Sequence, residues 1–242
     1  MSPGTNALEA RRLSCGYGPS VVVRDVDLHV GQGEVVALLG ANGAGKTTTL
    51  LTIAGVLPAM RGEITAMGER IERWPAPRIA RHGVVSIPDD RGLFPKLTVR
   101  ENLQLARRRG SADALDLFPE LTRRLGTPAG LLSGGQQQML AIARAFGRHP
   151  RLLLIDELSF GLAPIAVQRL LPTVRTVADE TGAGVLLVEQ HVHLGLSIAE
   201  RAYVLTHGSI ALTGTAAQLR DNTSLLHASY LGPVDNHEST TS

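Results

Sequence analysis

The chain has 242 residues, of which 43% are hydrophobic and 19% charged, and this apolar fraction excludes a disordered chain. A net charge of +2 with only 3% aromatic residues does not favour nucleic-acid binding. The single cysteine, Cys15, excludes an intramolecular disulfide and a cysteine-based zinc site, and no apolar run is long enough to span a bilayer, so we expect a soluble chain.

Strands and helices alternate along the chain, which predicts an α/β core with a mainly parallel sheet. An early strand over 20–30 is followed by a buried strand over 34–39, a glycine-rich loop and a helix over 47–54. Residues 97–131 have helical spacing of leucines, which predicts a small helical subdomain inserted into the core. Further buried strands are expected at 84–87, 152–155 and 185–188.

Two polar stretches are interpreted as surface. The triplet Arg107-Arg108-Arg109 is more typical of a solvated helix end than of a phosphate-binding patch. The residues after Gly232 form a polar tail that we expect to be frayed.

The loop between the strand over 34–39 and its helix matches G-x-x-x-x-G-K-[ST]. Its glycines allow backbone N–H groups to point at phosphate oxygens, and the helix N-terminus adds positive potential. Lys46 can reach the β- and γ-phosphates, while the Thr47 hydroxyl can bind Mg²⁺. We therefore predict that the chain binds ATP with Mg²⁺ through Gly40, Ala41, Asn42, Gly43, Ala44, Gly45, Lys46, Thr47 and Thr48.

Two carboxylates, Asp156 and Glu157, end the apolar strand over 152–155. Ligands lie at the carboxyl edge of a parallel sheet, so we expect both acids near the phosphate loop. Asp156 is predicted to hold Mg²⁺, directly or through water, and Glu157 to accept a proton from the attacking water.

The sequence LSGGQ over 132–136 lies between the phosphate loop and the acidic strand. It resembles the signature motif of ABC-type ATPases, in which this segment of one subunit caps the ATP held by another subunit. The resemblance also places Tyr17 where the family stacks an aromatic ring on adenine. Across a dimer interface, the implied nucleotide contacts are Ser133, Gly134, Gly135 and Gln136.

The resemblance extends over residues 8–232 and implies a P-loop NTPase (ABC ATPase) fold, with a mainly parallel sheet, N-terminal antiparallel strands and an inserted helical subdomain. It implies a single domain over 1–242. Its parts are a core of about 8–96 and 148–232, a helical subdomain of about 97–147 and the polar tail 233–242.

The stretches 87–103, GLAP at 161–164, VEQ at 188–190 and YLG at 230–232 are similar to one branch of that family. This branch comprises the ATPase subunits of importers for branched-chain and other hydrophobic amino acids. The resemblance implies an ATPase at the cytoplasmic face of the cell membrane. The implied partners are transmembrane permease subunits, a second ABC ATPase subunit or a second copy, and indirectly a solute-binding protein.

Several positions depart from the family pattern. Asp89 stands where most members have glutamine, which implies that a carboxylate faces Mg²⁺ or water. Gln190 aligns with the switch histidine, and because glutamine carries no positive charge we expect slower hydrolysis here than on a histidine-bearing partner. His191 follows directly, and it could replace that histidine only if the strand has already ended. Ala163 and Leu158 replace the usual aspartate and proline that follow the acidic pair.

Other functions stay open at this point. The ATPase could serve urea or amide import, or lipid or lipopolysaccharide export. A non-transport ABC ATPase acting on DNA or ribosomes is less favoured, because residues 47–132 leave no room for a long coiled coil and only one ATPase domain is present. A regulatory ATP-binding module without turnover is opposed by Lys46, Asp156 and Glu157, whereas Gln190 leaves it open.

Overall fold

The computed structural model describes residues 6–106 and 115–222, which form two β-sheets and flanking helices. The main sheet has the strand order β10-β9-β3-β8-β7-β6, and its neighbours are parallel except for β10 and β9. The parallel strands therefore share one carboxyl edge, where ligands are expected. The strands of this sheet are β3 (Val35–Leu39), β6 (Val84–Ile87), β7 (Leu152–Asp156), β8 (Gly184–Glu189), β9 (Arg201–Thr206) and β10 (Ser209–Thr215).

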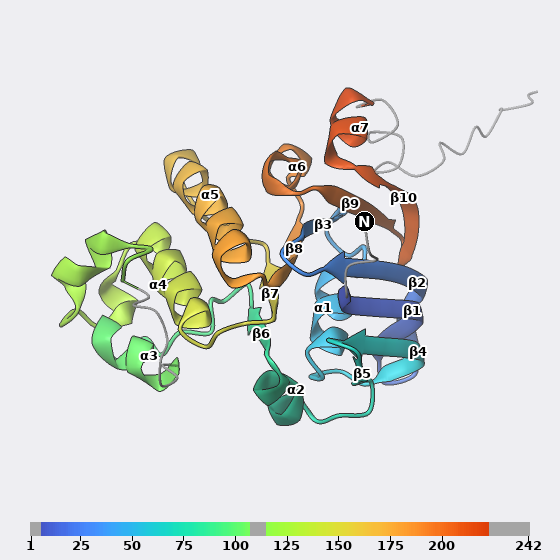
Figure 1. Ribbon diagram of the computed structural model, residues 1–242, viewed down its shortest axis with the longest axis horizontal. Helices are drawn as coiled ribbons and strands as arrows, with labels where there is room; N and C mark the ends of the chain where they lie inside the picture. The colour runs from blue at the N-terminus through green and yellow to red at the C-terminus, as the bar shows by residue number, and fades with distance from the viewer. Residues whose placement is uncertain (1–5, 107–114, 223–242) are drawn as a thin grey trace, which may run out of the picture.

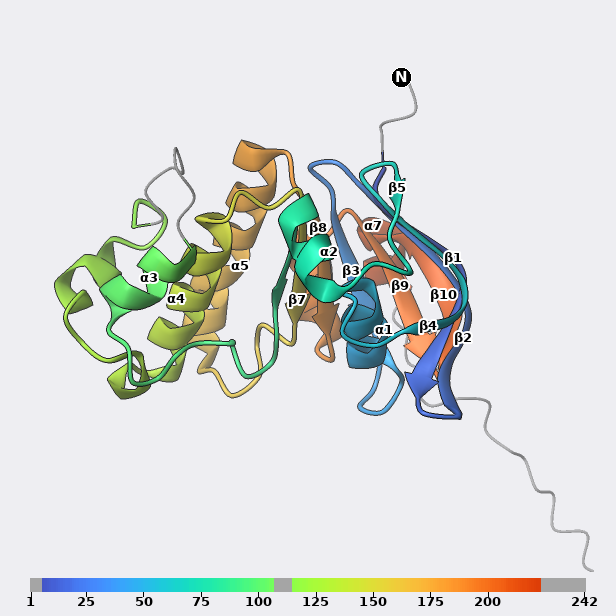
Figure 2. The ribbon, with the colours of Figure 1, turned by 90° about the horizontal axis from the view of Figure 1, so that it is seen from below.

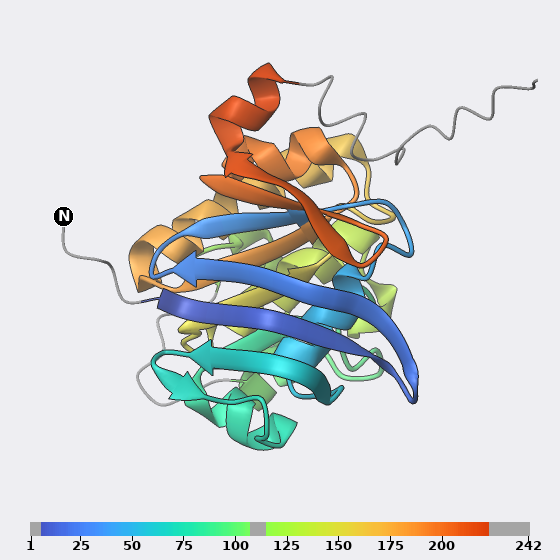
Figure 3. The ribbon, with the colours of Figure 1, turned by 90° about the vertical axis from the view of Figure 1, so that its right-hand side faces the viewer.

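A second sheet is antiparallel and has the strand order β2-β1-β4-β5 (Figure 3). Its strands are β1 (Asn6–Tyr17), β2 (Ser20–Gly31), β4 (Ala59–Ala66) and β5 (Glu69–Arg70). This sheet confirms the antiparallel N-terminal strands that the resemblance implies.

Helices cover both faces of the main sheet (Figures 1 and 2). In Figure 2, α1 lies between the two sheets, whereas α4 and α5 pack on the other side of β7 and β8. The helices are α1 (Lys46–Ile53), α2 (Ala76–His82), α3 (Val99–Ala106), α4 (Gly134–Phe146), α5 (Pro164–Thr181), α6 (Val192–Ile198) and α7 (Ala216–Asp221), with 3₁₀ turns at Pro119–Arg124 and Ala129–Leu131.

Strand β3 contributes side chains to two hydrophobic cores. All five of its residues are buried, and because side chains alternate along a strand they divide between the two faces. Val35, Ala37 and Leu39 join the cluster that contains α4 and α5. Val36 and Leu38 join the cluster that contains α1 and the antiparallel sheet. Both faces of the strand are thereby packed in a hydrophobic core.

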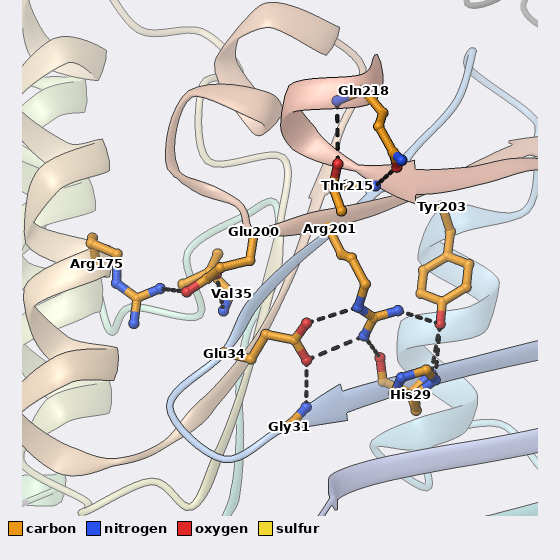
Figure 4. A network of polar contacts seen from close by, with 10 residues as sticks. All are labelled: His29, Gly31, Glu34, Val35, Arg175, Glu200, Arg201, Tyr203, Thr215 and Gln218. Atoms are coloured by element: carbon orange, nitrogen blue, oxygen red, sulfur yellow. Dashed lines mark hydrogen bonds and ion pairs between the residues drawn. The ribbon is translucent and has the colours of Figure 1, made fainter. Parts of the chain in front are cut away.

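A polar network fixes the amino edge of the main sheet, opposite the phosphate loop (Figure 4). Arg201 donates to Glu34 at 2.8 Å and to the Tyr203 hydroxyl at 2.7 Å. Glu200 accepts from the Val35 N–H at 2.8 Å and pairs with Arg175 on α5. Charged and polar side chains therefore connect the strands at the amino edge of the main sheet, away from the candidate site residues.

The expected strands over 20–30, 34–39, 84–87, 152–155 and 185–188 and the helix over 47–54 are confirmed to within two residues. Residues 97–131, where a small helical subdomain is expected, contain helical turns of two kinds. Among the described residues of this stretch, α3 is the one α-helix, 3₁₀ turns lie at Pro119–Arg124 and Ala129–Leu131, and Leu105 is 60% exposed. The triplet at 107–109, the segment 230–232 and the tail 233–242 lie outside the described residues. Among described helices, none has the length and apolarity needed to cross a bilayer.

Candidate functional site

The phosphate loop connects β3 to α1, as its sequence predicts. Gly43 and Gly45 have φ of 80° and 107°, a region that favours glycine. A Cβ on Gly40 would lie 2.5 Å from the Leu205 carbonyl oxygen, so this position tolerates no side chain without a backbone shift. The loop residues Ala41, Asn42, Gly43 and Ala44 line a cavity together with Leu205, Thr206 and His207.

Lys46 begins α1, and its ammonium group lies under the loop. The side chain is 4% exposed, and Nζ donates to the Gly40 carbonyl at 2.9 Å and to the Ala41 carbonyl at 3.1 Å. It also lies 3.5 Å from Glu157 Oε1. The fold thus brings the lysine of the loop and the second acid of the acidic pair together. Thr48, two residues further along the helix, is buried, and its carbonyl accepts from the Thr52 hydroxyl at 2.8 Å.

Asp156 ends β7 with a buried carboxylate. Its pKa is raised to about 6, chiefly by burial and also by the nearby Glu157 and Asp89 charges, while a hydrogen bond from Thr47 and the Lys46 charge oppose the rise. Its Oδ1 atom is buried and has no hydrogen-bond partner among the described residues. An ionised, buried oxygen without a partner is costly unless a cation or donor binds there.

Glu157 follows Asp156 with a φ of 46°, an uncommon conformation for a residue with a side chain. Its backbone N–H donates to the Val188 carbonyl at 3.0 Å, so the turn after β7 is attached to the end of β8. The left-handed backbone turns this side chain out of the strand pattern, toward Lys46.

Asp89 and Gln190 lie at the margin of this cluster. Asp89 is exposed, accepts from the Asp90 N–H at 2.8 Å, and is near enough to raise the pKa of Asp156. No group of three or more acidic, histidine or cysteine side chains that could hold a metal occurs in the described part of the chain. Gln190 is exposed and lies just beyond β8, which ends at Glu189. The strand has therefore ended before His191, which is the condition under which His191 could replace the switch histidine.

Two residues that the sequence reading did not single out connect these elements. Glu189 is fully buried and accepts from both the backbone N–H and the hydroxyl of Ser159, and that hydroxyl also lies 3.2 Å from His191 Nδ1. The sequence signal that could have identified Glu189 is its place as an acid at the end of an apolar strand, within VEQ.

The signature segment is built around a helix start. Ser133 is the N-cap of α4, where its hydroxyl accepts from the Gln136 N–H while the Gln136 side chain accepts from the Ser133 N–H. A Cβ on Gly135 would lie 3.1 Å from the Ala166 side chain, and Gly134 lies beside Leu162. The segment therefore packs against the residues that precede and begin α5.

The signature and the phosphate loop are not brought together within one chain. Their helices, α4 and α1, cover opposite faces of the main sheet (Figures 1 and 2). Tyr17, at the end of β1, is 50% exposed, which leaves its ring accessible.

The match to known families decides the class. Residues 23–159 match the family model described as ABC transporter. The chain belongs to the ABC transporter ATP-binding family. It is thus an ABC transporter ATPase, as the phosphate loop and the signature imply, and it binds ATP.

Three curated relatives of this ABC ATPase span nearly its whole length. A high-affinity branched-chain amino acid transport ATP-binding protein of Pseudomonas aeruginosa is 42% identical over 91% of this chain and 97% of its own. A probable branched-chain amino acid transport ATP-binding protein of Archaeoglobus fulgidus is 33% identical over 89% and 94%. A lipopolysaccharide export system ATP-binding protein of Haemophilus influenzae is 34% identical over 93% and 97%.

Solved structures agree with the fold of this ABC ATPase. An ATP-binding subunit of an ABC transporter superposes with a TM-score of 0.79 at 32% identity, and covers 93% of this chain and 98% of its own. A dimeric ATP-binding cassette bound to ADP and phosphate superposes with a TM-score of 0.76 at 22% identity, over 86% of this chain and 98% of its own.

Proposed function

We propose that this ABC ATPase powers an importer of branched-chain or other hydrophobic amino acids from the cytoplasmic face of the cell membrane. The observation that carries the proposal is the 42% identity, over 91% of the chain, to the branched-chain amino acid transport protein. The GLAP and VEQ stretches of the chain support the same branch. The solute itself is recognised by other subunits, namely the permease and a solute-binding protein.

Within the site, the phosphate loop Gly40–Gly45 receives the triphosphate, and Lys46 neutralises its outer phosphates. Tyr17 stacks on the adenine. Lys46 is already held by two loop carbonyls, which supports a fixed position for its charge. Thr48, in the first turn of α1, also belongs to the nucleotide-binding residues.

The buried Oδ1 atom of Asp156, unpartnered within the described part of the chain, supports a magnesium site. A hard oxygen atom that is buried, lacks a partner among the described residues and belongs to a side chain hydrogen-bonded by Thr47 fits a divalent cation that binds ATP. Thr47 and Asp156 would hold Mg²⁺, with exposed Asp89 adding negative charge nearby. When bound, Mg²⁺ supplies charge neutralisation for the phosphate oxygens.

Glu157 serves as the base that accepts the proton of the attacking water. Its contact with Lys46 places the carboxylate beside the group that meets the γ-phosphate. Gln190, just past β8, donates a hydrogen bond to the γ-phosphate without adding positive charge. We therefore expect slower turnover at this site than at a site that has histidine there.

Two chains are needed for a complete site, because α1 and α4 lie on opposite faces of the sheet within one chain. We assign Ser133, Gly134, Gly135 and Gln136 to the nucleotide of a second ABC ATPase subunit or a second copy. The 22% identical cassette that was solved as a dimer supports this arrangement. The helical subdomain 97–147 and the core, 8–96 and 148–232, then form one domain that closes on ATP and drives a separate transmembrane permease.

The proposal is tested by tagging Glu157→Gln and purifying it from native membranes with MgATP. This variant loses the base but keeps the groups that bind ATP, so it should accumulate in the closed state. Recovery of permease subunits, with amino-acid uptake abolished in cells carrying the variant, supports the proposal. The matched control is Lys46→Ala, which should recover less partner in the same MgATP.

A second candidate function, lipopolysaccharide or lipid export, is favoured only by the 34% identical export protein. Recovery of export subunits instead of an amino-acid permease would establish it and overturn the importer. Recovery of ribosomes or DNA would overturn both.

A further inference from the structure

Glu189 is a fully buried carboxylate at the last position of β8. Burial raises its pKa, and the hydrogen bonds from Ser159 oppose that effect. Its Oε1 atom accepts from the Ser159 N–H at 3.0 Å and its Oε2 atom from the Ser159 hydroxyl at 2.8 Å. The Glu189 carboxylate thus accepts hydrogen bonds from both the backbone N–H and the hydroxyl of Ser159, two residues after Glu157.

Ser159 ends a short segment that carries the proposed base. Glu157 at its start has a φ of 46° and donates its N–H to the Val188 carbonyl, while Leu158 in the middle is fully buried. The segment 157–159 is therefore attached to β8 at both ends. An uncommon backbone conformation persists only where neighbouring contacts fix it, and Glu189 supplies two of these contacts.

The same hydroxyl fixes the imidazole of His191. A serine hydroxyl has one proton, and donating it to the Glu189 carboxylate leaves only lone pairs for His191 Nδ1, which lies 3.2 Å away. Nδ1 must then carry the imidazole proton. Nε2 is left as the acceptor of the neutral ring, on the side away from the Glu189–Ser159–His191 contacts, which we call the clamp.

We propose that Glu189, acting through Ser159, is a positioning residue for ATP hydrolysis: it holds Glu157 in its left-handed backbone conformation and fixes His191 in the Nδ1–H tautomer. The inference rests on the proposed role of Glu157 as base. It assigns to His191, beside Gln190, an oriented ring nitrogen at the end of β8.

The first test compares steady-state ATPase kinetics of the purified full chain with those of Glu189→Gln and Ser159→Ala. Displacement of the base should lower kcat about 10- to 100-fold, with KM for ATP changed by less than about twofold. Ser159→Thr keeps the hydroxyl and the N–H, and should restore most of kcat. A KM that rises while kcat holds overturns the proposal.

The second test reads the tautomer directly by ¹⁵N NMR of histidine-labelled protein at about pH 8.5, where ordinary imidazoles are neutral. The wild-type His191 signal, assigned by its absence in His191→Ala, should report a proton on Nδ1. Glu189→Gln presents an amide donor to Ser159, so the hydroxyl must donate to Nδ1 and the proton should move to Nε2. An unchanged tautomer in Glu189→Gln and Ser159→Ala refutes the clamp even where a variant is poorly active.

Glu34→Gln is the matched control, because Glu34 is also a carboxylate that accepts from a backbone N–H and a side chain, at the opposite edge of the sheet (Figure 4). It should lower the melting temperature without lowering kcat. If Glu189→Gln behaves like Glu34→Gln, Glu189 is only structural. If wild type binds ATP but Glu157→Gln hydrolyses it at the wild-type rate, the proposed base is wrong instead.

Discussion

Lys46 Nζ lies 3.5 Å from Glu157 Oε1 while it donates to the carbonyl oxygens of Gly40 and Ala41. The ammonium group that should meet the phosphates is therefore within reach of the carboxylate that should activate water. The Lys46 side chain is 4% exposed, so little water screens this pair. A triphosphate entering the loop competes with Glu157 for the lysine charge.

Glu157→Gln should therefore bind ATP more tightly as it loses hydrolysis. Removing the carboxylate removes repulsion of the triphosphate, worth about tenfold in Kd, while loss of the base lowers kcat by about 10²- to 10⁴-fold. Equilibrium titration with a fluorescent ATP analogue and a phosphate-release assay measure the two effects. Tighter binding with full activity would show that another group is the base.

Lys46→Ala should weaken ATP binding by about 10- to 150-fold, the loss expected for charge-assisted hydrogen bonds. Lys46→Arg is the matched variant, because it keeps the positive charge but replaces the single ammonium donor held by the Gly40 and Ala41 carbonyls with a planar guanidinium. Isothermal titration of both variants checks the prediction. Unchanged affinity in Lys46→Ala would move the phosphates away from this loop.

Asp156→Asn should stabilise the nucleotide-free and metal-free protein at neutral pH. The pKa of Asp156 is about 6 in the fold against a usual value of 3.8, so the folded state binds the extra proton and the free energy of unfolding falls as pH rises from about 4 to 6. The neutral amide avoids this loss, about 1–3 kcal/mol at pH 8, and should make no difference below about pH 4. Urea denaturation with EDTA at both pH values measures it.

Asp179→Asn is the control for that experiment, because Asp179 is an exposed partner of Arg175 on α5. Its effect should be within about 0.5 kcal/mol at pH 8. Equal stability of Asp156→Asn and wild type at pH 8 would contradict the burial argument. In Asp156→Asn, magnesium-dependent ATP hydrolysis should be lost.

Ser133→Ala and Ser133→Asp should separate the capping and the phosphate-binding roles of the signature serine. Alanine removes the cap of α4 at a cost of about 1 kcal/mol, whereas aspartate keeps a cap but places a negative charge before the helix. Both should abolish ATP-dependent dimerisation of the Glu157→Gln chain in size-exclusion chromatography. Normal dimerisation by Ser133→Asp would exclude phosphate from this helix start.

Thr215→Ala is the matched control, because Thr215 and Gln218 form the same capping box at α7. It should cost a similar amount of stability and leave ATP-dependent dimerisation intact. A comparable loss of dimerisation would assign the Ser133 effect to folding.

Gln190→His should raise ATP turnover within an assembled transporter, because an imidazole can add positive charge toward the γ-phosphate and glutamine cannot. His191→Ala is the companion variant, since the clamp through Ser159 gives that ring a fixed orientation. No gain in phosphate release by Gln190→His would contradict the slow-site expectation.

The sequence alone was sufficient for the phosphate loop, the acidic pair and the signature helix, because each is a run of neighbouring residues whose local conformation follows from its own glycines, apolar strand or cap. Strands β3, β7 and β8 were predictable for the same reason, as fully buried apolar runs. The 3₁₀ turns at Pro119–Arg124 and Ala129–Leu131 were not, because a leucine spacing that favours helix does not determine which type of helical turn forms beside Pro119 and Pro128.

Tertiary structure decided the rest. The contacts of Ser159 with Glu189 and His191 join residues 30 and 32 positions apart, and they exist because β7 and β8 pair in parallel with Asp156 opposite Val188. Lys46 lies near Glu157 because β3 and β7 both pair in parallel with β8, whereas α1 and α4 are held on opposite faces by the two cores. Strand register and the division of side chains between the faces of a sheet are set by long-range packing, which no local run of residues encodes.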